Sequence, residues 1–180
     1  MKLCILFPGI GYHCDKPLLY YAGKLARSKG YEVKALKYSG FDTSVKDNED
    51  KMRNAAKLAL SQSKAQLADI DLSVYEKIIF IGKSIGTAAC LAYREDVRIN
   101  AECVLLTPIL QTFEMPSDNC TAFHGTADQW ADTSALRSVC QQKNVPLCEY
   151  NEANHSLETG DVMTDLKYLR DVIEKIERLL

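Results

Sequence analysis

A serine between two glycines stands where a strand is expected to pass into a helix. The segment Gly82–Gly86 reads Gly-Lys-Ser-Ile-Gly, follows the apolar run Lys77–Ile81, and precedes a stretch rich in small residues. A strand, a sharp turn and a helix in this order form a nucleophile elbow, which presents its serine at the tip of the turn. The two glycines lack the Cβ atoms that would collide in so tight a turn. We therefore interpret Ser84 as a candidate nucleophile.

A serine nucleophile needs a general base, and the base needs a carboxylate to orient it. The three histidines, His13, His124 and His155, all lie at or just beyond the end of a predicted strand, so topology alone does not choose among them. Local context is more selective, because Asp128 stands in a turn after a strand and His155 lies in the loop before the last predicted helix. We therefore expect Ser84, Asp128 and His155 to act as nucleophile, acid and base, an order known from one class of triad.

Some of these residues have alternative interpretations. Asp132 precedes a helix-like run that begins at Thr133, and it is either a rival acid or the cap of that helix. His124 is more consistent with a structural residue at a strand end, because Asp128 follows it so closely. The consecutive residues His13–Asp15 cannot easily converge on one ion, so we expect no metal site.

Four segments together resemble the small α/β-hydrolases, and the resemblance extends over essentially the whole chain. Gly82–Gly86 is similar to the nucleophile elbow of this family, and His124–Asp128 resembles its His-Gly-Thr-x-Asp segment, which carries the acid. Asn154–Ser156 resembles the segment that carries the histidine, and Pro8–Gly11 resembles the His-Gly-x-Gly loop after the third strand of the family. Compact carboxylesterases, thioesterases and dienelactone-hydrolase-like enzymes are the members that the chain resembles most.

The resemblance implies a fold with two departures from the family pattern. Pro8 stands where the family commonly has a histidine, and the first strand corresponds to the third strand of the family. Two earlier strands and any lid are therefore expected to be missing. The fold implied is one α/β domain over residues 1–180, a three-layer sandwich of about six parallel strands without a cap domain. Its first strand should lie beside both the second and the third.

Backbone amides are expected to form an oxyanion hole beside the serine. Ile85 follows the nucleophile and opens a helix, whose unpaired amides and dipole favour negative charge. The second donor should come from the turn Gly9–Ile10, and Ile10 is the best candidate. Lys83 is expected to point away from the chemistry, because an elbow exposes only its serine. The residues expected to border the substrate pocket are Gly9, Gly11, Tyr12 and Trp130.

Short apolar runs alternate with longer amphipathic stretches, which is typical of a parallel sheet with helices on both faces. The runs predicted as strands are Lys2–Phe7, Glu32–Tyr38, Lys77–Ile81, Glu102–Thr107, Cys120–His124 and Leu147–Tyr150. The stretches predicted as helices are Asp15–Lys29, Lys46–Leu67, Ser84–Arg94, Thr133–Lys143 and Glu158–Leu180. The polar residues Thr43–Asp50 are expected to open the second helix as a solvated surface. The link Thr107–Asn119 shows no clear helix and is expected to supply at most a pocket wall.

Composition narrows the classes of protein that fit. The 180 residues are 47% hydrophobic with a net charge of -2, which fits one globular domain and argues against nucleic-acid binding. Because no apolar run approaches the length of a membrane span or of a signal-peptide core, we expect no membrane partner. Seven cysteines, an odd number without a Cys-x-x-Cys pair, indicate free thiols in a reducing compartment, so we expect a cytoplasmic protein.

Taken together, these expectations predict that the protein is a serine hydrolase that needs no cofactor. It would cleave a small carboxylic ester or thioester through an acyl-enzyme, and its partner would be a small-molecule acyl substrate. Two alternatives stay open. One is a non-catalytic binding protein on a hydrolase scaffold, and the other is an acyltransferase or lyase that uses the same residues and shares the first half-reaction.

Overall fold

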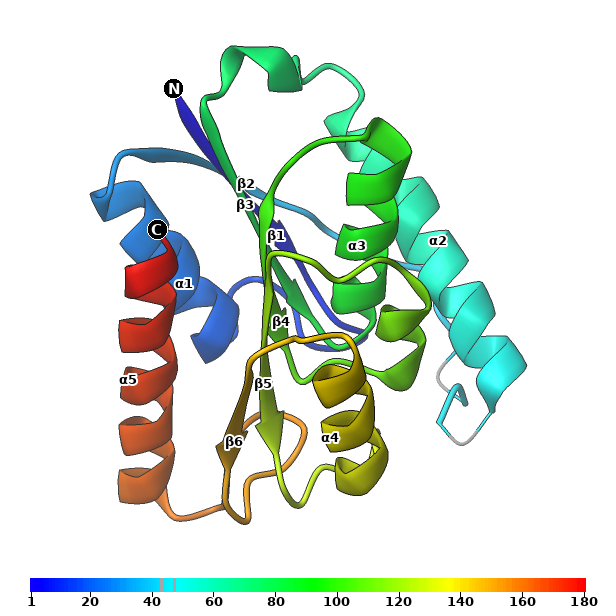
Figure 1. Ribbon diagram of the computed structural model, residues 1–180, viewed down its shortest axis with the longest axis vertical. Coiled ribbons are helices and arrows are strands. Elements are labelled where there is room, and N and C mark those ends of the chain that lie inside the picture. Colours follow the sequence, from blue (N-terminus) through cyan, green and yellow to red (C-terminus); the bar gives the residue numbers. More distant parts are fainter. Residues whose placement is uncertain (43, 47) are drawn as a thin grey trace.

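Six strands form one parallel sheet within residues 1–42, 44–46 and 48–180, the part of the chain that the computed structural model describes (Figure 1). The strands are β1 (Lys2–Phe7), β2 (Tyr31–Ala35), β3 (Lys77–Lys83), β4 (Glu102–Leu106), β5 (Cys120–Gly125) and β6 (Leu147–Tyr150). Their order across the sheet is β2-β1-β3-β4-β5-β6, and every adjacent pair is parallel. The predicted fold class is therefore confirmed, with the first strand between the second and the third.

Helices cover both faces of this sheet (Figure 1). The α-helices are α1 (Pro17–Ser28), α2 (Glu49–Leu67), α3 (Ile85–Val97), α4 (Thr133–Gln142) and α5 (Val162–Leu179), and the short 3₁₀ helices are η1 (Leu72–Val74) and η2 (Leu110–Glu114). Helices α1 and α5 pack together on one face, and α2, α3 and α4 lie on the other. The sandwich therefore has three layers.

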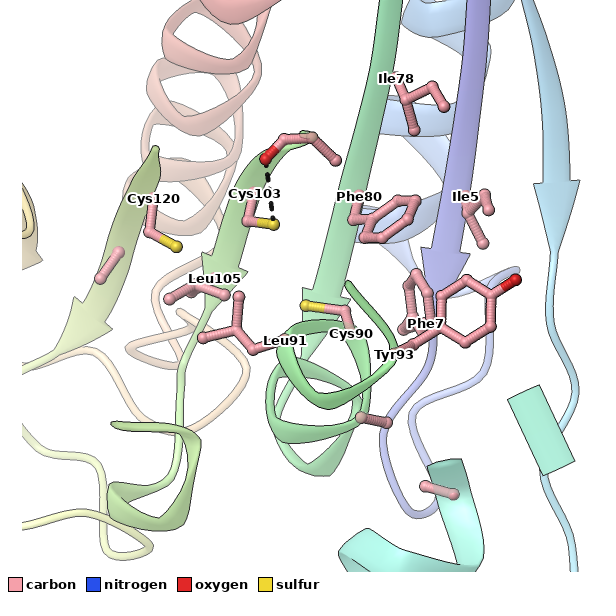
Figure 2. Packing of buried hydrophobic residues seen from close by; sticks show 14 of the residues in the cluster. Ile5, Phe7, Ile78, Phe80, Cys90, Leu91, Tyr93, Cys103, Leu105 and Cys120 are labelled. Atoms are coloured by element: carbon pink, nitrogen blue, oxygen red, sulfur yellow. Dashed lines mark hydrogen bonds between the residues drawn. The ribbon is translucent and has the colours of Figure 1, made fainter. Parts of the chain in front are cut away.

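Strand β3 shows why the sheet is buried on both faces. Successive side chains of a strand point to opposite faces, so Ile78 and Phe80 enter the core beneath α2 and α3, and Ile79 and Ile81 enter the core beneath α1 and α5. Figure 2 shows the first of these cores, where the rings of Phe7 and Phe80 lie 5.2 Å apart. Apolar residues on both faces thus anchor the strand that ends at the serine.

Several predicted elements have shorter bounds in the structure, and β2 and α5 are two examples. Strand β2 ends at Ala35 rather than Tyr38. Beyond it, the backbone N–H and carbonyl of Lys37 bond to the Gln66 side chain of α2 and not to a neighbouring strand. Gln66 Oε1 accepts from the Lys37 N–H at 2.9 Å, and Gln66 Nε2 donates to the Lys37 carbonyl at 2.8 Å. Helix α5 begins at Val162 rather than Glu158, after a loop that precedes its N-cap, Asp161.

The polar segment before α2 is only partly described. Helix α2 begins at Glu49, after Asn48, whose side chain accepts a hydrogen bond from the Lys51 N–H at 2.9 Å. The predictions for Thr43 and Asp47 lie outside the described residues. In the link 107–119 the structure has the 3₁₀ helix η2, where the sequence pattern indicated no helix.

The connections of β1 and β3 run to opposite faces of the sheet. Helix α1 follows β1 on one face, whereas α3 follows β3 on the other, and the two strands are neighbours. Such a point of divergence leaves a crevice at the carboxyl ends of the strands, where open α/β folds bind their ligands. The loop after β1 and Ser84 after β3 both lie at this crevice.

Candidate active site

Ser84 occupies a strained turn between β3 and α3. Its backbone has φ 55° and ψ -122°, a conformation that side chains other than glycine rarely adopt. A Cβ on Gly82 would lie 2.7 Å from the Gly86 carbonyl oxygen, and a Cβ on Gly86 would lie 2.1 Å from the Phe7 carbonyl oxygen. Both positions therefore require glycine, and the second of them lets the elbow contact the end of β1.

The structure brings Ser84, His155 and Asp128 into one hydrogen-bonded chain. His155 Nε2 lies 2.8 Å from Ser84 Oγ, and His155 Nδ1 lies 2.7 Å from Asp128 Oδ2. With the proton on Nδ1 held by the carboxylate, Nε2 is free to accept the serine proton. Asp128 Oδ1 accepts a hydrogen bond from the Trp130 N–H at 2.8 Å. Each oxygen of this buried carboxylate thus has a donor.

Two loops that are distant in sequence hold the acid and the histidine together. The N–H of Ala127 donates to the Ala153 carbonyl oxygen at 2.9 Å, and the N–H of Thr126 donates to the Tyr150 carbonyl oxygen at 2.9 Å. Gly125 permits this approach, because a Cβ there would lie 2.2 Å from the Ala153 oxygen. The glycine in the segment that resembles His-Gly-Thr-x-Asp therefore has a steric role.

The environment of His155 favours its neutral form. Burial lowers the pKa of His155 below its ordinary value of 6.5, the nearby charge of Lys83 acts in the same direction, and Asp128 opposes both. The indole of Trp130 stacks on the imidazole, with ring centroids 5.4 Å apart and an angle of 28° between the planes. A neutral imidazole is the form that can act as a base.

The other candidate acid and histidines take different places. Asp132 accepts a hydrogen bond from the Ala135 N–H at 2.8 Å and is the N-cap of α4. His124 is fully buried, its Nε2 lies 2.9 Å from Thr133 Oγ1, and burial lowers its pKa. His13 lies on the exposed surface beside Asp15, with its Nδ1 3.5 Å from a carboxylate oxygen.

Two residues that border the pocket of the serine have backbone N–H groups without an acceptor among the described residues. Ile85 is the first residue of α3, where an N–H has no acceptor within the helix. Ile10 lies within a tight turn in which the Gly9 N–H donates to the Tyr12 carbonyl oxygen at 3.0 Å. Among the described residues, neither the Ile10 nor the Ile85 N–H has a hydrogen-bond acceptor. Both residues border the same pocket as Ser84, so their amides are available to an anionic oxygen.

A pocket with a volume of about 260 Å³ opens in front of Ser84. Of the residues expected to border it, Gly11, Tyr12 and Trp130 do so. Gly9 does not border this pocket. A Cβ on Gly9 would be 3.2 Å from Ser84 Cβ, and Gly9 borders a neighbouring cavity of about 520 Å³. The complete lining of the first pocket is Ile10, Gly11, Tyr12, Met52, Lys83, Ser84, Ile85, Trp130, His155 and Ser156.

Three residues of this lining were not expected. Met52 comes from the first turns of α2 and contacts Ile85 in a small apolar cluster, and no local pattern distinguishes it from other core residues of that helix. Ser156 could have been found as the neighbour of His155. Lys83 borders the pocket although it was expected to point away, because its side chain runs beneath Tyr12.

Other kinds of site receive no support from the described residues. Within residues 1–42, 44–46 and 48–180, no group of three or more His, Cys, Asp or Glu side chains is placed to hold a metal ion. Among the helices of the same ranges, none combines the length and the apolar character needed to cross a bilayer. The seven cysteines are free, and burial raises the pKa of the Cys14 thiol to about 12.

The sheet order, the strand-to-helix elbow and the absence of an inserted cap within the described residues define the α/β-hydrolase fold in its lidless form. No protein-family model and no curated protein matches the sequence. The chain nevertheless resembles solved structures over almost its whole length, at low sequence identity.

Three of these structures illustrate the likeness. An α/β serine hydrolase homologue from Coxiella burnetii has a TM-score of 0.68 and 15% identity, over 100% of this chain and 85% of that chain. Est1E from Butyrivibrio proteoclasticus has a TM-score of 0.71 and 14% identity, over 99% and 86%. An α/β serine hydrolase without a lid from Xanthomonas campestris has a TM-score of 0.61 and 13% identity, over 99% and 82%. Such similarity establishes the fold, and the chemistry has to be argued from the site.

Proposed function

We propose that the protein is a serine hydrolase that cleaves small carboxylic esters or thioesters. The observation that carries this proposal is the hydrogen-bonded chain from Ser84 through His155 to Asp128, which ends at an open pocket. Two structures with the same fold are described as serine hydrolases or their homologues, which supports the class of reaction.

The geometry suits attack by the serine on an acyl carbonyl. His155 Nε2 takes the proton of Ser84 as Oγ bonds to the carbonyl carbon, and Asp128 stabilises the resulting imidazolium. The carbonyl oxygen becomes an anion, which the amides of Ile10 and Ile85 bind. Loss of one such donor typically slows a reaction by about 100- to 1000-fold. These amides and the histidine thus stabilise charges that exist only after attack has begun.

Two further steps complete the reaction. The imidazolium of His155 gives its proton to the departing alcohol or thiol, and an acyl group remains on Ser84 Oγ. Water then enters the open pocket, loses a proton to the same Nε2, and attacks the acyl carbonyl. The serine leaves with the proton from His155, and a carboxylic acid is released.

The dimensions of the pocket favour a small substrate. Its volume of about 260 Å³ is below the range of about 300–1,000 Å³ that is typical of sites for drug-sized ligands. Met52, Ile85 and Trp130 supply apolar surface on one side of it, which suits a short acyl chain or an aromatic ring. Ferulic acid, an aromatic carboxylic acid, is bound in a structure of Est1E, which supports an acyl substrate of this general chemistry.

Covalent labelling tests the proposed nucleophile directly. We expect a fluorophosphonate probe to modify Ser84 and to leave Ser84→Ala unlabelled, with much slower labelling of His155→Ala. Ser156→Ala is the matched control, because Ser156 borders the same pocket but is not part of the hydrogen-bonded chain. A folded protein that the probe does not modify, or modifies at Ser156, would contradict the proposal.

A panel of esters tests the substrate class. We expect p-nitrophenyl acetate and butyrate to be hydrolysed faster than longer esters, and acyl thioesters of the same chain lengths to be hydrolysed as well. The release of free carboxylic acid in water, without an added acceptor, separates hydrolysis from acyl transfer. Release that persists in Ser84→Ala would exclude this mechanism.

A further inference from the structure

Lys83 is a buried lysine directly before the proposed nucleophile. Its side chain is 1% exposed, and it shares one face of β3 with Ile79 and Ile81, beneath α1 and α5. Its Nζ lies 4.8 Å from the centroid of the Tyr12 ring, a distance that permits a cation–π contact. The ring of Tyr12 therefore lies against the ammonium group.

The charge of this lysine has no direct partner among the described residues. No carboxylate of those residues lies within 4.0 Å of Nζ, and Nζ donates no hydrogen bond to any of them. Asp128 is near enough to attract the ammonium, but its two oxygens already accept from His155 and from the Trp130 N–H. The positive field of Lys83 is therefore not cancelled by an ion pair at close range.

His155 is the group on which this field acts. Both residues border the pocket in front of Ser84, and the charge of Lys83 disfavours a second positive charge on the imidazole. Burial lowers the pKa of Lys83 to about 7, with Asp128 and Glu158 opposing. The attraction of Asp128 and Glu158 thus favours the charged form of the lysine.

Other charged or titratable groups also act on this pair. Asp128 raises the pKa of His155, and His124, from the neighbouring strand β5, lowers it. Glu158, from the loop after β6, attracts Lys83, and Tyr12 covers the ammonium with its ring. Of the groups that lower the pKa of His155, Lys83 is the lysine, whereas burial lowers the pKa of His124 and so disfavours a charge on it.

We propose that Lys83 is a positioning residue for the proposed hydrolysis: its buried charge holds the imidazole of His155 in the neutral, proton-accepting form under mildly acidic conditions. The proposal rests on the proposed function of the same site. Its consequence is an active range that extends to lower pH than the hydrogen bond between His155 and Asp128 alone would allow.

Three lysine variants test the electrostatic effect. Lys83→Met keeps the length of the side chain and removes its charge, whereas Lys83→Arg keeps the charge at every accessible pH. Lys46→Met is the matched control, because Lys46 is an exposed lysine whose Nζ lies 6.0 Å from the Trp130 ring. The imidazole of His155 is titrated by NMR in each protein, which needs no enzymatic activity.

We expect the titration of His155 to shift in only one of the three variants. The midpoint of His155 should move to higher pH in Lys83→Met and stay at the wild-type value in Lys83→Arg and Lys46→Met. The acid limb of kcat/KM for a neutral p-nitrophenyl ester, normalised to the plateau of each protein, should move by the same amount, with KM unchanged. A merely structural role would lower the plateau without moving the midpoint.

Opposite results would overturn the inference. An unchanged midpoint in Lys83→Met, or an equal shift in Lys46→Met, would show that the charge of Lys83 does not act on His155. If Lys83→Met fails to fold, Lys83→Gln makes the same comparison, and an unchanged His155 midpoint in that variant contradicts the proposal. A protein that shows the expected NMR shift but hydrolyses no ester would contradict the proposed function alone.

Discussion

The indole of Trp130 stacks on the imidazole of His155, with ring centroids 5.4 Å apart, while the backbone N–H of Trp130 donates to Asp128 Oδ1 at 2.8 Å. One residue thus orients both partners of the His155–Asp128 hydrogen bond. Trp130 was expected only to border the substrate pocket, and it does so, but it also restricts the rotation of the proposed base.

Removal of the Trp130 ring should therefore weaken catalysis more than folding. We expect Trp130→Ala to lower kcat by about 10- to 100-fold, because small displacements of a catalytic group have effects of this size. Trp130→Phe, which keeps an aromatic ring, should retain most of the activity. Ester hydrolysis and thermal unfolding of both variants check this. An alanine variant with wild-type kcat would show that the stacking has no role in positioning.

Met52 should limit the length of the acyl chain. Its side chain is nearly buried and borders the pocket beside Ile10 and Ile85. We expect Met52→Ala to enlarge the pocket and to raise the ratio of kcat/KM for p-nitrophenyl hexanoate to that for the acetate by about 10-fold or more. Met163→Ala, at an exposed position on α5, is the control and should leave this ratio unchanged. An unaltered ratio in Met52→Ala would place the acyl chain elsewhere.

Gly125→Ala should disrupt the contact between the two loops that carry Asp128 and His155. The new Cβ would lie 2.2 Å from the Ala153 carbonyl oxygen, and both groups belong to the backbone framework, so neither can turn away. We expect a loss of about 1–3 kcal/mol in the free energy of unfolding, together with a large loss of activity.

Gly160→Ala is the control that shows the effect of backbone strain without a clash. Gly160 has φ 91°, and a Cβ added there would meet open space, so the substitution adds strain without a clash. It should lower the free energy of unfolding and leave kcat close to the wild-type value. Urea unfolding and ester hydrolysis of both variants check this. If Gly125→Ala were more active than Gly160→Ala, the clash with Ala153 would not be what disturbs the site.

Hydrolysis should have an acid limb below pH 6.5. The pKa of His155 is lowered from 6.5, chiefly by burial, so the imidazole stays neutral and able to accept a proton somewhat below that pH. Activity should thus be nearly constant from about pH 7 to 8 and fall as the pH drops further below 6.5. A pH profile of kcat/KM for p-nitrophenyl acetate checks this, and a midpoint above 6.5 would contradict it.

Folding stability should decline over a similar range. The pKa values of His124 and His155 are lowered in the folded protein, so between those values and 6.5 the unfolded chain binds more protons than the folded one. The free energy of unfolding should therefore be highest above pH 6.5 and decrease as the pH falls through the folded pKa values. Urea unfolding at about pH 7.5 and 5.5 measures this loss, which should be smaller in His124→Gln. Equal loss in the variant would exclude His124 as a contributor.

Local sequence patterns were sufficient to predict the strands and helices and to select the candidate catalytic residues. The glycines around Ser84, the segment that ends at Asp128 and the loop that carries His155 are short patterns whose residue types depend on local backbone geometry. The alternation of apolar strands with amphipathic helices likewise depends on neighbours within a few residues, so it predicted a parallel sheet that the structure confirms.

Contacts between distant segments decided which acid pairs with His155 and which side chains line the pocket. The assignment of Asp132 as a helix cap and of Asp128 as the partner of His155 depends on where the loop after β6 packs. Lys83 borders the pocket because Tyr12, 71 residues earlier by their numbers, covers its ammonium, and Met52 borders it because the start of α2 lies beside Ile85. The residue types and local turns are properties of the sequence, whereas burial and electrostatic surroundings arise only when the layers of the sandwich pack together.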